Sequence, residues 1–258
     1  MSKTSKKIII ANWKMNPERV SDAAALAKKI ERAAAASAGR GVEIVAAPPF
    51  PFLAAVGRVL KKARLGAQDV FWEGAGAYTG EVSPAQLKNM GVSYVIVGHS
   101  ERRTHLSETD EMIAKKINAA LEAGLAAILC VGEPERAGAD IPPIVGEQLR
   151  SALGRIKKEL LKNLVVAYEP VWAISTTPGR AGAATPDSAF RARIFIEKVL
   201  VSLFGARAQK DVRVIYGGSV TPDNTAAFLR EGRMDGVLVG GASLHAKEFG
   251  AIVRSASV

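Results

Sequence analysis

Residues 94–131, YVIVGHSERRTHLSETDEMIAKKINAALEAGLAAILCV, contain two apolar runs separated by one amphipathic stretch. The runs 94–97 and 126–131 are apolar on consecutive positions, which is typical of parallel strands buried on both faces. Between them, Ser107 is the expected N-cap of a helix and Gly124 is its expected stop. The segment therefore predicts one strand–helix–strand unit.

The same alternation continues along the whole chain. The candidate strands are 8–13, 42–47, 64–67, 94–97, 126–131, 164–168, 212–216 and 236–239. Of the helical segments between them, 21–38 is alanine-rich and ends at Gly39, while Thr185 and Thr221 each cap a helix that begins with proline. Eight such units in 258 residues predict an α/β protein, a single (β/α)8 TIM barrel over residues 1–258, rather than two doubly wound domains.

Composition narrows the class of protein. No apolar run approaches the roughly 18 to 20 residues of a membrane helix, and the basic N-terminus lacks the apolar region of a secretory signal. We therefore expect a cytoplasmic protein that does not enter a membrane. Cys130 is the only cysteine, which excludes an internal disulfide, and His99, His105 and His245 show no metal-ligand spacing. Nothing in the sequence indicates a metal or an organic cofactor.

The formal net charge of +10 favours attraction to phosphates, including those of nucleic acid. However, the lysines and arginines occur in ones and twos on segments that read as helix, such as Lys115-Lys116 and Lys157-Lys158. This distribution is typical of solvated helix faces. We therefore expect no nucleic-acid partner.

Because a barrel of this kind carries its chemistry on the loops after its strands, the residues at the strand ends are the candidates. Asn12 and Lys14 follow the first strand, where an ammonium group can neutralise an anionic substrate. His99 follows the fourth strand and precedes a helical segment, so its ring can hydrogen-bond a substrate oxygen. Taken singly, a solvated lysine and a structural histidine remain ordinary alternatives.

Glu169 ends the sixth strand and is followed by a proline, a valine and a tryptophan. A carboxylate that a closing loop removes from water becomes a stronger base, although a salt-bridged structural glutamate would read the same way. The paired glycines Gly217-Gly218 and Gly240-Gly241 follow the seventh and eighth strands. Their backbone N–H groups can approach an anion closely, which predicts a phosphate site at these two loops.

Several motifs in these loops resemble the triosephosphate isomerase family, in its order and over nearly the whole chain. They are Asn12-Trp13-Lys14, Gly98-His99-Ser100-Glu101-Arg102-Arg103, Ala167-Tyr168-Glu169-Pro170-Val171-Trp172, Tyr216-Gly217-Gly218-Ser219-Val220, Val239-Gly240-Gly241-Ala242-Ser243 and Gly76-Ala77-Tyr78-Thr79-Gly80-Glu81. The resemblance implies the interconversion of dihydroxyacetone phosphate and D-glyceraldehyde 3-phosphate through an enediolate, in glycolysis and gluconeogenesis, without a cofactor or a metal.

The resemblance also implies roles for individual residues. Glu169 would be the base, His99 the neutral electrophile, Lys14 the positive charge and Asn12 an orienting group. Phosphate would be held by Asn12, Lys14 and backbone near Ser175, Ser219, Gly240 and Gly241. Glu101 and Ser100 would support the pocket. Thr79 would lie at the tip of a loop through which the family forms homodimers.

Two features leave room for other interpretations. Residues 175–178 read Ser-Thr-Thr-Pro where the family has Gly-Thr-Gly-Lys, and about four extra residues follow, so we expect retained chemistry with altered lid kinetics. The glycine-rich loops would equally serve an isomerase of another phosphorylated sugar on the same fold. A non-catalytic binder of phosphorylated ligands or nucleic acid is the alternative from another class.

Overall fold

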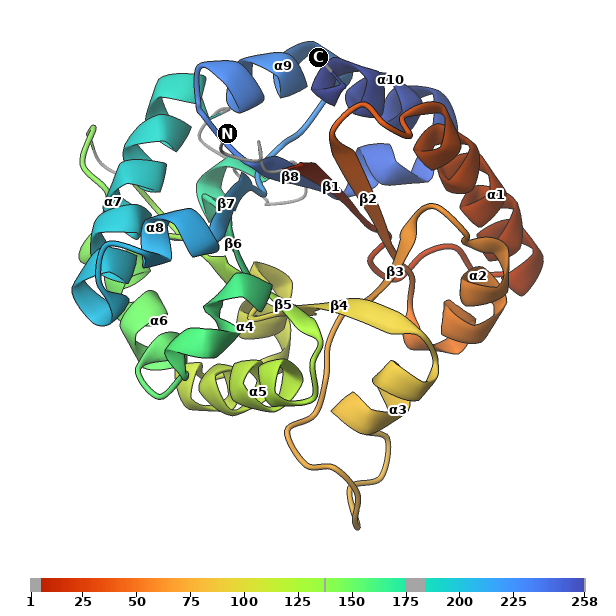
Figure 1. Ribbon diagram of the computed structural model, residues 1–258, viewed down its shortest axis with the longest axis horizontal. Helices are drawn as coiled ribbons and strands as arrows, with labels where there is room; N and C mark the ends of the chain where they lie inside the picture. Colours follow the sequence, from red (N-terminus) through yellow and green to blue (C-terminus); the bar gives the residue numbers. More distant parts are fainter. Residues whose placement is uncertain (1–5, 137, 175–183, 258) are drawn as a thin grey trace.

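The computed structural model describes residues 6–136, 138–174 and 184–257. Within these residues, eight parallel strands close into a barrel in chain order, as Figure 1 shows. The strands are β1 (Lys7–Asn12), β2 (Val42–Ala47), β3 (Arg64–Ala67), β4 (Val92–Val97), β5 (Ala126–Val131), β6 (Leu164–Tyr168), β7 (Arg213–Tyr216) and β8 (Gly236–Val239). The predicted (β/α)8 TIM barrel is confirmed, and each predicted strand lies within two residues of its observed bounds.

The barrel closes where β1 pairs with both β2 and β8, with Ile8 opposite Glu43 on one side and Gly236 on the other. Helices form the outer ring (Figure 1). They are α1 (Val20–Ala36), α2 (Leu53–Val59), α3 (Pro84–Asn89), α4 (Ser100–Leu106), α5 (Asp110–Glu122), α6 (Pro143–Leu153), α7 (Pro186–Phe204), α8 (Ala208–Asp211), α9 (Pro222–Arg230) and α10 (Ala246–Ala256). Short 3₁₀ helices occupy Phe50–Phe52, Lys158–Asn163, Val171–Ala173 and Gly241–Leu244. Every helix in the described ranges is too short or too polar to span a bilayer.

Most predicted helix ends are confirmed, and one is wrong. Thr185 and Thr221 cap α7 and α9, and each takes part in a capping box. Ser107 does not cap the following helix: it ends α4 in the left-handed region, with φ of 53°. The cap of α5 is Thr109, whose hydroxyl oxygen accepts from the backbone N–H of Met112 at 3.3 Å. The error arose because a short helix, α4, precedes Ser107 and uses that residue as its stop.

Two apolar layers hold the barrel together. One lies between the strands and the helices, and the other fills the barrel interior. The interior layer consists of Ile8, Ile10, Val45, Ala47, Tyr94, Ile96, Ile128, Cys130, Val165, Ala167, Ile215 and Leu238, all 7% exposed or less. The barrel is therefore a packed core, which leaves the loops at its ends to form sites.

A polar triad crosses the barrel at the amino ends of the strands. Arg213 donates from Nη1 to Glu43 Oε2 at 2.9 Å and from Nη2 to the Tyr94 hydroxyl oxygen at 3.0 Å. The Tyr94 hydroxyl donates in turn to Glu43 Oε1 at 2.9 Å. Because the three residues come from β7, β2 and β4, they tie distant strands together at the end opposite the candidate loops.

The connection between β3 and α3 projects from the barrel (Figure 1), and residues 73–81 within it are exposed. Aromatic residues organise its base: the Phe71 ring lies 4.1 Å from that of Trp72 and 4.8 Å from that of Tyr78, centroid to centroid.

Candidate active site

A pocket opens at the carboxyl ends of the strands, where the sequence predicted the chemistry. Its lining consists of Asn12, Lys14, His99, Glu169, Ile174, Gly217, Gly218, Ser219, Val220, Leu238, Gly240, Gly241 and Ala242. This set includes every predicted catalytic and phosphate-binding residue that lies among the described residues. Residues separated by more than two hundred positions in the sequence therefore converge on one place.

Glu169 continues β6 for one residue, because its backbone N–H donates to Val131 O at 2.8 Å. Its side chain points into the pocket and the residue is only 1% exposed. Oε2 accepts a hydrogen bond from the backbone N–H of Ser100 at 3.2 Å. Oε1 lies 3.3 Å from His99 Nε2 and accepts no hydrogen bond from the described residues. This buried oxygen is thus available to accept a proton.

His99 is the N-cap of α4, and its ring is oriented by that helix. The Nδ1 atom accepts the backbone N–H of Glu101 at 3.2 Å. Since Nδ1 serves as an acceptor, the proton of the neutral ring is on Nε2, the nitrogen that faces Glu169. The ring therefore presents a hydrogen-bond donor to the pocket.

Lys14 supplies the positive charge of the pocket from an unusual backbone conformation, with φ of 52°. Such a conformation costs a non-glycine residue about 1 to 3 kcal/mol, so surrounding contacts must maintain it. Its N–H donates to Asn12 Oδ1 at 3.0 Å, and its carbonyl accepts from Gln68 Nε2 at 2.9 Å. The ammonium group pairs with Glu101 Oε1 at 2.5 Å. Glu101 thus lies beside Lys14.

In the loop after β7, Gly217 is needed for close packing around Glu169. A Cβ atom on Gly217 would lie 2.8 Å from Cγ of Glu169, a distance that real Cβ atoms do not tolerate. The Gly217 N–H donates to Tyr168 O at 2.8 Å, which fixes the loop against β6. Ser219, Gly240 and Gly241 line the other part of the pocket, where the sequence predicted phosphate.

The remaining predicted residues have different positions. Ser100 touches the base through its backbone N–H. Thr79 is exposed on the projecting loop and does not line the pocket of its own chain. Ser175 and the unusual segment 175–178 lie outside the described residues.

Comparison with known proteins agrees with this geometry. The family model described as "Triosephosphate isomerase" matches residues 7–256. A triosephosphate isomerase of Caldanaerobacter subterraneus subsp. tengcongensis is 44% identical over 251 residues, which cover 96% of this chain and 98% of that protein. One from Dictyoglomus thermophilum is 42% identical over 254 residues, or 97% and 99% of the two chains. One from Geotalea uraniireducens is 43% identical over 253 residues, or 96% and 98%.

The chain belongs to the triosephosphate isomerase family. It is an intramolecular aldose–ketose isomerase, and the reaction of the family interconverts dihydroxyacetone phosphate and D-glyceraldehyde 3-phosphate, a step of glycolysis. The match over nearly the whole chain decides against the two alternatives that the loops alone left open, a different sugar-phosphate isomerase and a non-catalytic binder. In the described part of this isomerase, no group of three or more His, Cys, Asp or Glu side chains is arranged to hold a metal ion.

Sequence reasoning missed residues that lie close to Glu169 outside the main pocket. Cys130 is fully buried on β5, and its pKa is raised well above the usual range by burial, by the charge of Glu169 and by a hydrogen bond to it. The thiol is therefore protonated, and it shares a small cavity with the Glu169 carboxylate. Cys130 reads as one more apolar residue of a strand, so no sequence signal could have singled it out.

The side chain of Glu133 holds the segment that follows Glu169 in place. The buried carboxylate of Glu133 accepts from the Tyr168 hydroxyl at 2.8 Å and from Trp172 Nε1 at 2.9 Å. Burial first, and then the Glu133 charge, raise the pKa of Tyr168. These bonds fix both ends of the Glu169–Val171 segment, so the backbone of the base is held on either side.

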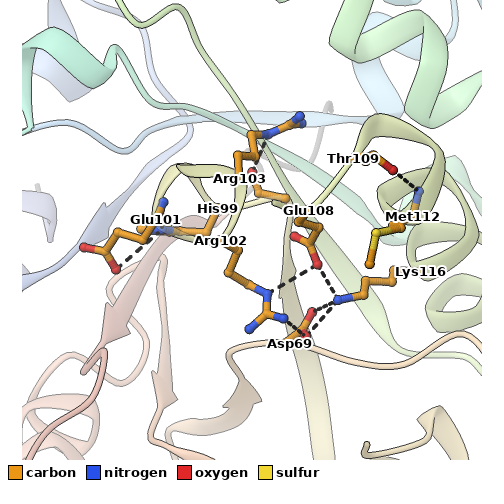
Figure 2. A network of polar contacts seen from close by, with 10 residues as sticks. Asp69, His99, Glu101, Arg102, Arg103, Glu108, Thr109, Met112 and Lys116 are labelled. Atoms are coloured by element: carbon orange, nitrogen blue, oxygen red, sulfur yellow. Dashed lines mark hydrogen bonds and ion pairs between the residues drawn. The ribbon is translucent and has the colours of Figure 1, made fainter. Parts of the chain in front are cut away.

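A buried ionic cluster holds α4, the helix that begins at His99. Figure 2 shows Arg102 and Lys116 converging on Asp69 and Glu108. Lys116 Nζ lies 2.8 Å from both carboxylate oxygens of Asp69 and also bonds Glu108 Oε1, while Arg102 Nη2 lies 2.7 Å from Asp69 Oδ2. Burial raises the pKa of Asp69, and the charges of Lys116 and Arg102 oppose that rise. The cluster ties α4 to α5 and to the base of the projecting loop.

Proposed function

We propose that Glu169 is the base of the isomerisation. Its carboxylate takes a proton from carbon 1 of dihydroxyacetone phosphate, and the electrons of that C–H bond move toward the carbonyl at carbon 2, giving an enediolate. The same carboxyl group then returns the proton to carbon 2, which yields the aldehyde. The position of Glu169 supports this role, because its carboxylate lines the pocket and lies 3.3 Å from His99 Nε2, where a substrate carbon and its oxygen could be reached together.

The developing charge requires a donor at the substrate oxygens. The Nε2–H group of His99 faces the pocket and can donate to the carbonyl oxygen, and it can relay the oxygen-bound proton between oxygens 1 and 2. Lys14 adds a positive charge from the carboxyl end of β1, and Asn12 holds the Lys14 backbone in its left-handed conformation. In this proposal, the substrate oxygen replaces the Glu169–His99 contact.

The phosphate group would lie over the loops after β7 and β8. Ser219, Gly240 and Gly241 line this part of the pocket, and Lys14 lies beside Gly240, since a Cβ atom there would be 3.3 Å from Lys14 Cε. Backbone N–H groups at paired glycines are suited to a dianion. Ser175 is proposed as a further backbone donor on the basis of the resemblance alone.

One observation carries the assignment: Glu169 Oε1 and His99 Nε2 lie 3.3 Å apart in a pocket that also contains Lys14. The test is a coupled assay with dihydroxyacetone phosphate. Glu169→Asp keeps the carboxylate but withdraws it by about 1 Å, so kcat should fall about 100-fold. Glu169→Gln removes the base, so kcat should fall by about 10⁴-fold. Full activity of the glutamine variant would refute the role of Glu169.

We also propose a homodimer formed through the projecting loop. Thr79 is exposed at its tip, and Met15, next to Lys14, is 92% exposed. A partner's loop that covers Met15 would bury this methionine and place Thr79 near the pocket. We infer in addition that the whole chain, 1–258, acts as one domain and that it works in the cytoplasm, where its proposed substrate is metabolised.

The loop proposal is tested with Thr79→Arg. A long charged side chain at the tip should prevent docking, so analytical ultracentrifugation should show a monomer with much reduced kcat. Lys158→Arg, on an exposed 3₁₀ helix, serves as the control and should keep the assembly of the unaltered chain. A Thr79→Arg protein with unchanged mass and activity would contradict the proposal.

A further inference from the structure

Arg103 forms hydrogen bonds to the backbone carbonyl groups of both Gly98 and His99. Its own N–H donates to His99 O at 3.1 Å, and its side-chain Nε donates to Gly98 O at 2.9 Å. The carbonyl groups before and after the imidazole-bearing residue are thus held by the same arginine. Figure 2 shows that Arg102 and Arg103 leave α4 in opposite directions, so Arg103 takes no part in the Asp69–Lys116 cluster.

The Arg103 guanidinium is itself fixed at a second point. Nη1 pairs with Asp110 Oδ1 at 2.5 Å, in the first turn of α5, and the Arg103 side chain is 20% exposed. The Asp110 carboxylate also lies at the N-terminus of α5, where the helix dipole favours a negative charge. Arg103 therefore connects a rigid helix end to the peptide that precedes His99.

The Arg103 side chain also shares a small cavity with Glu169. Nη2 is buried and has no hydrogen-bond partner among the described residues. Arg103 lines a cavity of about 20 Å³ together with Cys130 and Glu169. The charge of Arg103 also acts on Cys130, because it opposes the rise of the thiol pKa. A buried positive charge thus lies behind the carboxylate, on the side away from the substrate pocket.

Gly98 makes this arrangement possible. Its φ is 73°, and a Cβ atom there would lie 3.3 Å from Arg103 Nη2 and 3.1 Å from Ile113 Cδ1. The left-handed turn directs the Gly98 carbonyl at the arginine and the following residue into the pocket. Without a partner for that carbonyl, the direction of the His99 ring would depend on Nδ1 alone.

We propose that Arg103 is a positioning residue for the isomerisation: it sets the imidazole of His99 through the Gly98 carbonyl and supports Glu169 from behind. It does not touch the substrate. Its loss should therefore reduce the rate of the chemical step and leave phosphate binding intact, because Arg103 is not among the residues that line the pocket beside Ser219, Gly240 and Gly241. The inference rests on the proposed roles of His99 and Glu169.

The test compares Arg103→Met with a matched arginine elsewhere. Arg193 on α7 is 15% exposed, donates to the Arg233 carbonyl and pairs with Asp235 Oδ2 at 2.9 Å, so its bonds are of the same kind. It lies at the amino end of β8, far from the pocket. Arg103→Met should lower kcat about 10- to 100-fold, with KM and the inhibition constant of inorganic phosphate changed less than about twofold. Arg193→Met should lower the Tm and leave kcat unchanged.

Two further variants keep the test decisive should Arg103→Met fail to fold. Arg103→Lys keeps one donor for Gly98 O but cannot also reach Asp110, so its kcat should lie between those of Arg103→Met and the unaltered chain. Asp110→Asn removes the anchor of the guanidinium and should produce a smaller fall in kcat than Arg103→Met. In the double variant the two effects should not add, because both act through one contact.

A spectroscopic readout separates positioning from general destabilisation. In protein labelled with ¹⁵N-histidine, the Nε2 resonance of His99 should shift in Arg103→Met and not in Arg193→Met. If Arg103→Met only lowers the Tm with kcat and the His99 resonance unchanged, the proposal is overturned. It is also overturned if the phosphate inhibition constant rises in parallel with the fall in kcat. If Glu169→Asp, made with Arg103 in place, leaves kcat unchanged, the proposed function is contradicted. That result would not bear on the contacts of Arg103.

Discussion

The absence of a side chain at Gly217 determines where the Glu169 carboxylate can lie. The methylene group of Glu169 occupies the space that any Cβ atom on Gly217 would fill, at 2.8 Å from Cγ. The same glycine is bonded to Tyr168 O, so its backbone cannot withdraw without breaking the contact with β6. The Glu169 carboxylate can therefore take its position only because the residue after β7 has no side chain.

Gly217→Ala should accordingly displace Glu169 and reduce kcat by about 10- to 100-fold, with a smaller effect on the Tm. Steady-state kinetics and thermal unfolding measure the two quantities. Gly39→Ala is a useful control, because nothing lies within 4 Å of its Cβ position although its φ is 81°. That variant should lower the Tm and leave kcat alone. Equal kcat in both variants would show that Glu169 tolerates displacement.

At the residue scale, the sequence identified the groups that line the pocket but not those that surround them. Glu169 and His99 could be predicted because a polar residue directly after a buried strand is conspicuous. Gln68, Cys130 and Arg103 could not be predicted, because their contacts depend on distances between elements. The sequence around Cys130 indicates only an apolar strand, and the charged residues around Arg103 indicate an exposed helix.

At the scale of elements, the buried cluster between α4 and α5 decides how firmly the His99 helix is held. Lys116 is 2% exposed and satisfies two carboxylates, Asp69 and Glu108. An ion pair at this depth adds little net stability compared with apolar packing, but removing one partner leaves buried charges uncompensated.

Lys116→Met should lower the free energy of unfolding by about 3 to 5 kcal/mol, measured by urea denaturation. Its neighbour Lys115 is half exposed and pairs with an exposed glutamate on the same helix, so Lys115→Met should change stability far less. A Lys116→Met protein as stable as the Lys115→Met protein would mean that the two acidic side chains find other partners.

Elements could be predicted well where one kind of signal dominates. The strands are apolar on both faces, and the Thr-Pro pairs mark the starts of α7 and α9 with little ambiguity. The start of α5 was misplaced because Ser107 and Thr109 are both good caps, and only the tertiary path of α4 selects between them. Local propensity could not make that choice.

At the scale of the whole molecule, burial of phenol groups makes stability depend on alkaline pH. Burial raises the pKa values of Tyr94, Tyr168 and Tyr216. A group whose pKa is higher in the folded chain contributes stability that is complete below its ordinary pKa, about 10 for tyrosine, and is lost as the pH rises above it.

We therefore expect the free energy of unfolding to be insensitive to these tyrosines up to about pH 10 and to fall steadily above it. In a spectrophotometric titration, the phenolate absorbance of the three buried residues should appear together with the loss of circular dichroism. Tyr94→Phe should reduce the slope of stability against pH above pH 10. Phenolate absorbance from buried tyrosines in a still folded chain would contradict the expectation.

The triad of Arg213, Glu43 and Tyr94 has a consequence for the exchange of protons with bulk water. Behind it, the barrel interior is filled by apolar side chains, which oppose the entry of water from the amino ends of the strands. In the proposed mechanism, a hydrogen that Glu169 takes from the substrate would then leave through the mouth of the pocket. The fraction of the transferred hydrogen that exchanges with solvent in each turnover should therefore depend on how long the mouth of the pocket stays open.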